Sequence, residues 1–163
     1  MKKKDSQSRK KAASTAVIPA TGKEPASLDD LISNLRTIIR ESRQQVLRTA
    51  DVVQVRTCWT VGRHIVEFEQ GGATRADYGR GLLARLAEHL TSEFGRGFDA
   101  SNLYKMSRFY RLFPNLDALR LNLSWTHYRL LLRVDDEAAR LLYMNEAADH
   151  HWNTRALERQ MGT

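Results

Sequence analysis

The sequence predicts an all-α fold of about seven helices. Only one proline, Pro114, occurs between Ala26 and Thr163, and the helix-forming residues Leu, Ala, Arg and Glu dominate that region. No segment alternates apolar and polar residues with the period of a β-strand. With 163 residues, the chain is long enough to form one domain with a hydrophobic core and an additional tail.

The net charge of +7 is concentrated in the first 26 residues. Residues 1–26 hold seven Lys and Arg against two acids (+5), which leaves 19 against 17 (+2) for residues 27–163. The first segment has almost no large apolar residue, so we expect a disordered basic tail. A solubilising leader is preferred over a phosphate-seeking arm. The folded helical domain is expected over residues 27–163.

Two helices are expected in the first part of the domain. Ser27 and Asp30 form a variant of the capping box, and an apolar face then extends from Leu28 towards Val46. A second helix is expected from about Asp51 until Gly71-Gly72. Its apolar face is so wide that it predicts burial on two sides, against other helices or against a partner subunit. That face comprises Val52, Val55, Cys58, Trp59, Val61, Gly62, Ile65, Val66 and Phe68.

The next two helices have the pattern of a helix-turn-helix. The first runs from about Tyr78 to Phe94, and Gly95-Arg96-Gly97 supplies a turn, since glycine permits positive φ. Asp99 is the expected N-cap of the second helix, the element that usually enters a DNA groove. The side chains expected to face inward are Leu82, Leu83, Leu86, Leu90 and Phe94 in the first helix, and Leu103, Met106, Tyr110 and Phe113 in and after the second.

Three shorter helices are expected after Pro114. Ser124 is the predicted N-cap of a helix that runs to about Val134, with Trp125, Tyr128, Leu131 and Leu132 facing the core. A second helix is expected over 136–149. Trp152-Asn153-Thr154-Arg155 then caps a last helix, which runs into Leu157 and Met161.

The candidate DNA contacts are polar side chains of the predicted helix-turn-helix and of the helices that follow. Arg and Asn pair well with guanine and adenine edges in the major groove, although an ordinary solvated helix face has the same pattern. Residues 99–133 hold six Lys and Arg against two acids (+4), whereas residues 134–163 hold three against six (−3). The expected base-reading face is Asn102, Lys105, Arg108 and Arg111, and the expected phosphate contacts are Arg129, Arg133 and Arg155.

Several short motifs occur in a specific order along the folded part. They are Trp59-Thr60-Val61-Gly62-Arg63-His64-Ile65; Tyr78-Gly79; Gly97-Phe98 with Asn102-Leu103; Phe109-Tyr110 with Phe113-Pro114; Leu123-Ser124-Trp125-Thr126-His127; and Trp152 with Arg155, Leu157 and Gln160. With these motifs the chain resembles the amino-terminal domain of the YhcG family of bacterial proteins, over about residues 28–161. In that family this domain usually precedes a PD-(D/E)XK nuclease-like domain. The resemblance implies a DNA-targeting or assembly module with a nuclease partner.

The chain itself is not expected to be an enzyme or to hold a cofactor. It contains no Glu-x-Lys triplet, so the carboxylates and lysine of a PD-(D/E)XK site are missing. His150 and His151 are adjacent and form a poor chelate on a helix, so no metal site is expected. His127 is expected to hydrogen-bond locally, and Cys58 is expected to be an inert buried thiol.

The residues therefore favour a module that binds duplex DNA, and the resemblance implies an associated PD-(D/E)XK nuclease activity that this chain does not carry. The alternative is a protein-interaction or dimerisation module that uses the apolar face of residues 51–70 and makes no DNA contact. The two functions are compatible, because helix-turn-helix proteins commonly form homo-oligomers. RNA binding ranks last, since no exposed aromatic cluster is expected. A single cysteine and the lack of a long apolar run predict a soluble cytoplasmic protein outside the membrane.

Overall fold

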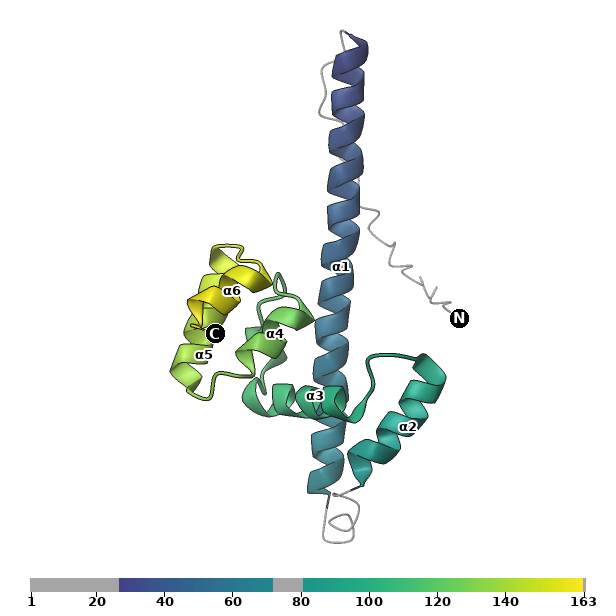
Figure 1. The fold of residues 1–163 in the computed structure, drawn as a ribbon, viewed down its shortest axis with the longest axis vertical. Coiled ribbons are helices and arrows are strands. Elements are labelled where there is room, and N and C mark those ends of the chain that lie inside the picture. The colour runs from purple at the N-terminus through teal and green to yellow at the C-terminus, as the bar shows by residue number, and fades with distance from the viewer. Residues whose placement is uncertain (1–26, 72–80, 163) are drawn as a thin grey trace, which may run out of the picture. The chain divides into compact units, whose positions relative to one another are not determined.

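The computed structural model describes residues 27–71 and 81–162, and this part of the chain is entirely helical (Figure 1). It contains no strand, which confirms the predicted all-α class. The predicted tail and the predicted helix start at Tyr78 lie outside the described residues. The elements are α1 (Leu28–Gln70), α2 (Leu82–Phe94), α3 (Ala100–Leu112), the short 3₁₀ helix η2 (Leu116–Ala118), α4 (Trp125–Leu131), α5 (Glu137–Asp149) and α6 (Thr154–Gln160).

Helix α1 replaces the two helices that the sequence predicted over residues 27–70. It starts where expected, since the Ser27 side chain accepts a hydrogen bond from the Asp30 amide at 3.1 Å. It then continues for 43 residues, so the predicted break before Asp51 was wrong. No glycine or proline lies between Val46 and Asp51 to interrupt the helix. The change in the apolar pattern at this point marks a change of face on one helix.

The chain divides into two compact units, residues 1–40 and residues 41–163. The second unit contains the hydrophobic core, to which α1 contributes its carboxyl-terminal part. There α2 lies on one side of α1, and α4 to α6 lie on the other (Figure 1). The side chains of α1 that are buried are Val55, Cys58, Trp59, Ile65 and Val66. This confirms that much of the wide apolar face of residues 51–70 is buried, here against helices of the same chain.

Close backbone contact joins α1 to α3. A β-carbon built on Gly62 would lie 1.9 Å from the carbonyl oxygen of Met106, so only glycine fits at this crossing. One helical turn away, the indole Nε1 of Trp59 donates a hydrogen bond of 2.7 Å to the Phe113 carbonyl. The Trp59 ring also packs edge-on against Tyr110 at 5.1 Å. These contacts fix α3 across α1.

An aromatic cluster joins α3 to α4. The Phe109 ring lies 5.3 Å from Trp125 and 4.8 Å from Tyr128, and Phe113 lies 5.6 Å from Tyr128. The fully buried Tyr128 hydroxyl donates to the Arg120 carbonyl at 3.1 Å and accepts from the Arg120 amide at 2.9 Å. Buried polar groups need such partners, so the hydroxyl is satisfied without water. The cluster therefore sets the distance and angle between α3 and α4.

Side-chain caps begin the helices of the carboxyl-terminal half largely as predicted. Asp99 accepts from the Asn102 amide at 3.0 Å, and Asp136 and Asn153 cap α5 and α6 in the same way. The predicted inward residues of α3 and α4 lie in the core or pack against it. The inward position predicted for Phe94 was wrong. This residue is 61% exposed because it is the last residue of α2, and the chain turns away at Gly95.

Candidate nucleic-acid interface

A groove of about 460 Å³ lies between α3 and α4, and it is the strongest candidate site in the described part of the second unit. Helix α3 contributes residues spaced at i, i+3, i+4 and i+7, and α4 contributes residues at i, i+3 and i+4, so each set lies on a single helix face. Four of the lining side chains are cationic and none is acidic. The lining residues are Ser101, Tyr104, Lys105 and Arg108 of α3, and Thr126, Arg129, Leu130, Leu132 and Arg133 in and after α4.

The structure thus brings together four of the seven side chains that the sequence nominated for DNA contact. Lys105 and Arg108 come from the predicted base-reading face, and Arg129 and Arg133 come from the predicted phosphate contacts. The first pair and the second pair are separated by more than twenty residues in the sequence, so tertiary packing brings them together. The aromatic cluster of Phe109, Trp125 and Tyr128 holds the two helices side by side.

The cations of the groove differ in their pairing. The Arg108 guanidinium forms a 2.9 Å ion pair with Asp135, whose side chain is 93% exposed. Arg133 lies 3.4 Å from Glu158. Within residues 27–71 and 81–162, the structure shows no ion pair for Lys105 or Arg129. Exposed ion pairs contribute little free energy, so an anionic ligand can replace Asp135 or Glu158 at small cost.

The other three nominated residues lie away from the groove. The Asn102 side-chain amide donates to the Gly97 carbonyl at 2.7 Å and stabilises the turn before α3. Arg111 forms an ion pair with Glu69 of α1. Arg155 is an exposed residue of α6 and does not line the groove. Helical spacing placed Asn102 and Arg111 on the polar side of α3, but these two side chains bind parts of their own chain.

Three polar residues of the groove were missed by the reasoning from sequence. Ser101 and Thr126 supply hydroxyls, which can donate to phosphate oxygens, and Tyr104 supplies a half-exposed ring. Helical spacing could have found them, because Ser101 and Tyr104 precede Lys105 and Arg108 by four residues on the same face of α3. Thr126 likewise precedes Leu130 by four residues on the same face of α4.

The connection between α2 and α3 has the geometry of a tight turn. Gly95 has φ of 80° and Gly97 has φ of 107°, the left-handed region that favours glycine. The turn returns the chain so that α2 packs on α3. The geometry agrees with the glycine turn and the Asp99 cap that the sequence predicted.

Two groups with catalytic potential outside the groove, Cys58 and His127, have structural roles. Burial raises the pKa of the Cys58 thiol to about 12, so this thiol stays protonated and inert near neutral pH. His127 Nδ1 accepts from the Ser124 amide at 3.2 Å, and Nε2 donates to the Trp152 carbonyl at 2.9 Å. This local bonding confirms the prediction for His127. Among the described residues, no group of His, Cys, Asp and Glu side chains is arranged to hold a metal ion.

The fold and groove together define an all-helical domain with a basic groove between two short helices. The family model for the DUF1016 N-terminal domain matches residues 34–163, so the chain belongs to that family and the predicted resemblance is confirmed. The chain is 31% identical to the Escherichia coli (strain K12) protein named "Putative nuclease YhcG". The alignment covers 77% of this chain and 42% of that relative's length. No solved structure matches this chain.

None of the described helices combines the length and the hydrophobicity that crossing a bilayer requires.

Proposed function

We propose that this domain binds duplex DNA through the basic groove between α3 and α4, and so targets a PD-(D/E)XK nuclease activity that its own residues do not supply. The observation that carries the proposal is the convergence of Lys105, Arg108, Arg129 and Arg133 on one groove that has no acidic lining residue. Neighbouring cations repel one another, and an anionic ligand relieves that repulsion. We also propose that the domain acts in the bacterial cytoplasm, where its proposed partner, duplex DNA, is located.

The distribution of groups in the groove favours a phosphate backbone as the ligand. Most protein–DNA hydrogen bonds go to phosphate and sugar oxygens, from Arg, Lys, Ser, Thr and Tyr side chains. The groove presents all five of these residue types, on α3 at one wall and on α4 at the other. We propose that α2 and α3 form a helix-turn-helix in which α3 is the second helix. Lys105 and Arg108 of α3 would then contact the DNA bases directly.

The proposed association with a nuclease depends on the family relationship. The relative's printed name describes a nuclease, and this chain spans less than half of that relative's length. We therefore propose a targeting role for this domain and assign it no catalytic residue, metal or cofactor.

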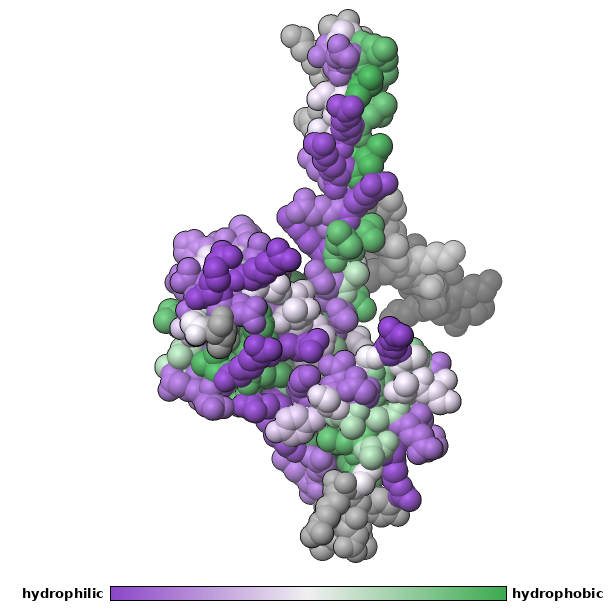
Figure 2. Space-filling model, viewed as in Figure 1, coloured by the Kyte–Doolittle hydropathy of each residue, from purple (hydrophilic) through white to green (hydrophobic). Residues whose placement is uncertain are grey.

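The alternative function is a protein-interaction or dimerisation module that makes no direct DNA contact. The observation in its favour is a series of exposed apolar side chains in the amino-terminal half of α1, visible as a green band in Figure 2. The two functions use different residues, so separate variants distinguish them.

The DNA proposal is tested by fluorescence anisotropy of a labelled duplex titrated with Lys105→Ala/Arg129→Ala. These are the two groove cations without an ion pair among the described residues. We expect affinity to fall at least tenfold, and the dependence of log K on log salt to weaken by about one to two units, one for each lost phosphate contact.

The matched control is Arg155→Ala/Arg159→Ala, which removes two exposed cations from α6, away from the groove. We expect this control to bind DNA with an affinity within about twofold of the wild type. Salt screens charges that lie far from the binding site, so their removal changes the affinity little. Equal losses in the two double variants would reject the groove as the binding site. Wild-type affinity in Lys105→Ala/Arg129→Ala would also reject it.

A further inference from the structure

One face of α1 carries large apolar side chains that stay in solvent. Leu28, Ile32, Leu35 and Ile39 in the first unit are between 37% and 71% exposed. In the second unit Val46 and Val53 are 68% and 59% exposed. Exposed apolar side chains in a row along one helix are costly in water and mark an interaction surface.

The spacing of these residues follows the heptad of a coiled coil. The steps along the chain alternate between four and three residues from Leu28 to Val53 without interruption, and this period of 3.5 favours a left-handed supercoil. The a positions are Ile32, Ile39, Val46 and Val53, and the d positions are Leu28, Leu35, Ser42 and Thr49. We call these eight positions the α1 seam.

The α1 seam ends where α1 begins to pack on its own core. The next a and d positions would be Arg56, Thr60, Arg63 and Glu67, and all four are exposed and polar. The buried face of α1 begins at Val55, outside the heptad positions. The helix thus has two separate apolar faces along its length, and the core formed by the described residues contains none of the eight seam residues.

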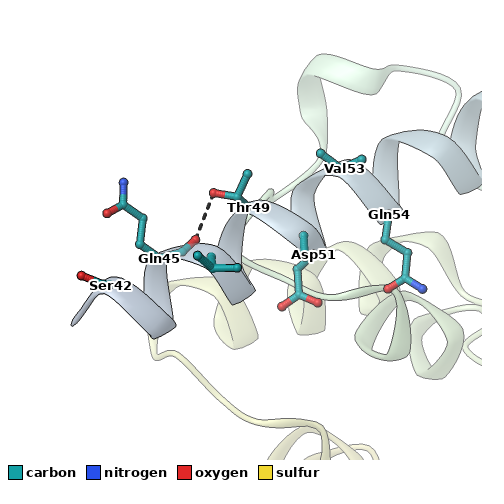
Figure 3. A pocket seen from close by; sticks show the side chains of 8 residues that line it. Ser42, Gln45, Thr49, Asp51, Val53 and Gln54 are labelled. Atoms are coloured by element: carbon teal, nitrogen blue, oxygen red, sulfur yellow. Dashed lines mark hydrogen bonds between the residues drawn. The ribbon is translucent and has the colours of Figure 1, made fainter. Parts of the chain in front are cut away.

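The residue types in the α1 seam favour two parallel strands. β-branched residues occupy every a position, and leucine occupies the first two d positions, which is the preference of parallel dimers. The seam corresponds to about 39 Å of helix. That is the three to four heptads that a coiled coil requires. Thr49 can be buried at its d position because its hydroxyl already donates a hydrogen bond of 3.0 Å to the Gln45 carbonyl of the same helix (Figure 3).

The charges beside the α1 seam select the orientation. In a parallel pair, Arg36 and Arg43 lie beside Ile and Leu side chains of the second copy, which their aliphatic stems can cover. In the antiparallel pair that aligns the whole seam, Arg36 lies opposite Arg43 of the second copy. Like charges at these flanking positions are destabilising, so the parallel pair is preferred.

We infer that residues 28–53 of α1 pair with the same residues of a second copy as a parallel two-stranded coiled coil. A surface hollow in the second unit lies on this face, and its described lining includes the seam residues Ser42, Val46, Thr49 and Val53 (Figure 3). The second copy would cover this hollow together with the exposed side chains of the first unit. The pairing is independent of the DNA groove, so either proposal can fail alone.

The first test is the mass of the full chain by light scattering after size exclusion, without DNA. One chain has a mass of 18.7 kDa, and we expect twice that value. In Leu35→Lys/Ile39→Lys the seam receives four ammonium groups per dimer, and the mass should fall twofold. A wild-type mass of one chain, or of three or four, overturns the two-stranded inference.

The matched control is Ser33→Lys/Thr37→Lys, which adds the same two charges with the same spacing on another face of α1. Both native residues are exposed, and the Thr37 hydroxyl forms a local hydrogen bond of 3.1 Å to the Ser33 carbonyl within the same helix. We expect this variant to remain dimeric. Dissociation of both lysine variants would overturn the assignment of the seam. Far-UV circular dichroism of each variant verifies that the helices are retained.

Orientation is tested by disulfide formation in the full chain carrying Thr49→Cys. In the parallel pair the two introduced thiols meet at one d layer, and mild oxidation should cross-link most of the protein. In the antiparallel pair position 49 lies opposite position 32, and no cross-link forms. Thr37→Cys is the control, since position 37 lies on the outside of the pair. A cross-link at 37 alone, or at neither position, overturns the parallel arrangement.

Discussion

The backbone carbonyl of Met106 occupies the place where any side chain at position 62 would begin. A β-carbon on Gly62 would lie 1.9 Å from that oxygen and 2.5 Å from its carbon. Both atoms belong to the backbone of α3, so a side-chain rotation cannot relieve the clash. The position of α3 on α1, and with it one wall of the basic groove, depends on this glycine.

Gly62→Ala should therefore destabilise the domain. The α3 backbone must move by more than an ångström, and overpacking of this kind costs about 1–3 kcal/mol or more. Gly81→Ala is the control, because its added methyl meets nothing within 4 Å. Urea denaturation followed by tryptophan fluorescence measures both variants. Equal stability of the two alanine variants would contradict the close crossing.

Asp135 should weaken DNA binding, because it pairs with Arg108 at the edge of the groove. We expect Asp135→Ala to bind duplex DNA about 1.4- to fivefold more tightly, in line with the roughly 0.2–1 kcal/mol that exposed pairs contribute. Asp149→Ala removes a similar exposed carboxylate that lies 3.8 Å from Arg120, and should leave affinity unchanged. Weaker binding by Asp135→Ala would indicate that Arg108 needs its partner and does not contact DNA.

His127 should be a structural residue. Its ring joins the start of α4 to the Trp152 carbonyl, and its removal leaves Ser124 and Trp152 without these bonds. We expect His127→Ala to lower the free energy of unfolding by about 1–3 kcal/mol, the usual cost of unsatisfied partners. His64→Ala, at an exposed position of α1, should be near neutral. Thermal denaturation of both variants tests this, and an unchanged midpoint for His127→Ala would refute it.

Cys58 should make the domain less stable in alkali. Burial raises its pKa from 9.0 to about 12, so between these values the native chain keeps a proton that the unfolded chain releases. The native state then binds more protons, and the free energy of unfolding falls as pH rises through that range. Burial raises the pKa of Tyr128 as well, but that contribution is common to the wild type and to Cys58→Ala.

The loss of stability between pH 8 and pH 10.5 should consequently be smaller in Cys58→Ala than in the wild type. Urea midpoints at the two pH values measure this difference. Identical losses would show that the thiol ionises as readily in the native state as in the unfolded chain.

Local features of the fold were predictable from sequence. The Ser27 and Asp99 caps, the glycine turn at Gly95 and the inward face of α3 follow from short-range rules that the structure obeys. The break predicted before Asp51 failed for a physical reason. The apolar stripe shifts to another face at this point, but α1 continues, and its exposed apolar face is followed by a face that is buried in the core.

The candidate site was predictable only in part. Polarity and helical spacing nominated Lys105 and Arg108, but Asn102 and Arg111 satisfied the same rule and are bound within the chain. Only tertiary packing, through Phe109 and its ring contacts to α4, brings Arg129 beside α3. Spacing along one helix carries no information about that juxtaposition.

The most direct test of the central claim is titration of duplex DNA with the full chain and with a chain that lacks residues 1–26, each at two salt concentrations. The removed segment carries a charge of +5 and could bind phosphate by itself. The account predicts that the shortened chain still binds, and that its affinity falls steeply as salt rises. Binding that disappears with residues 1–26 while the helices remain folded would contradict DNA recognition by the α3–α4 groove.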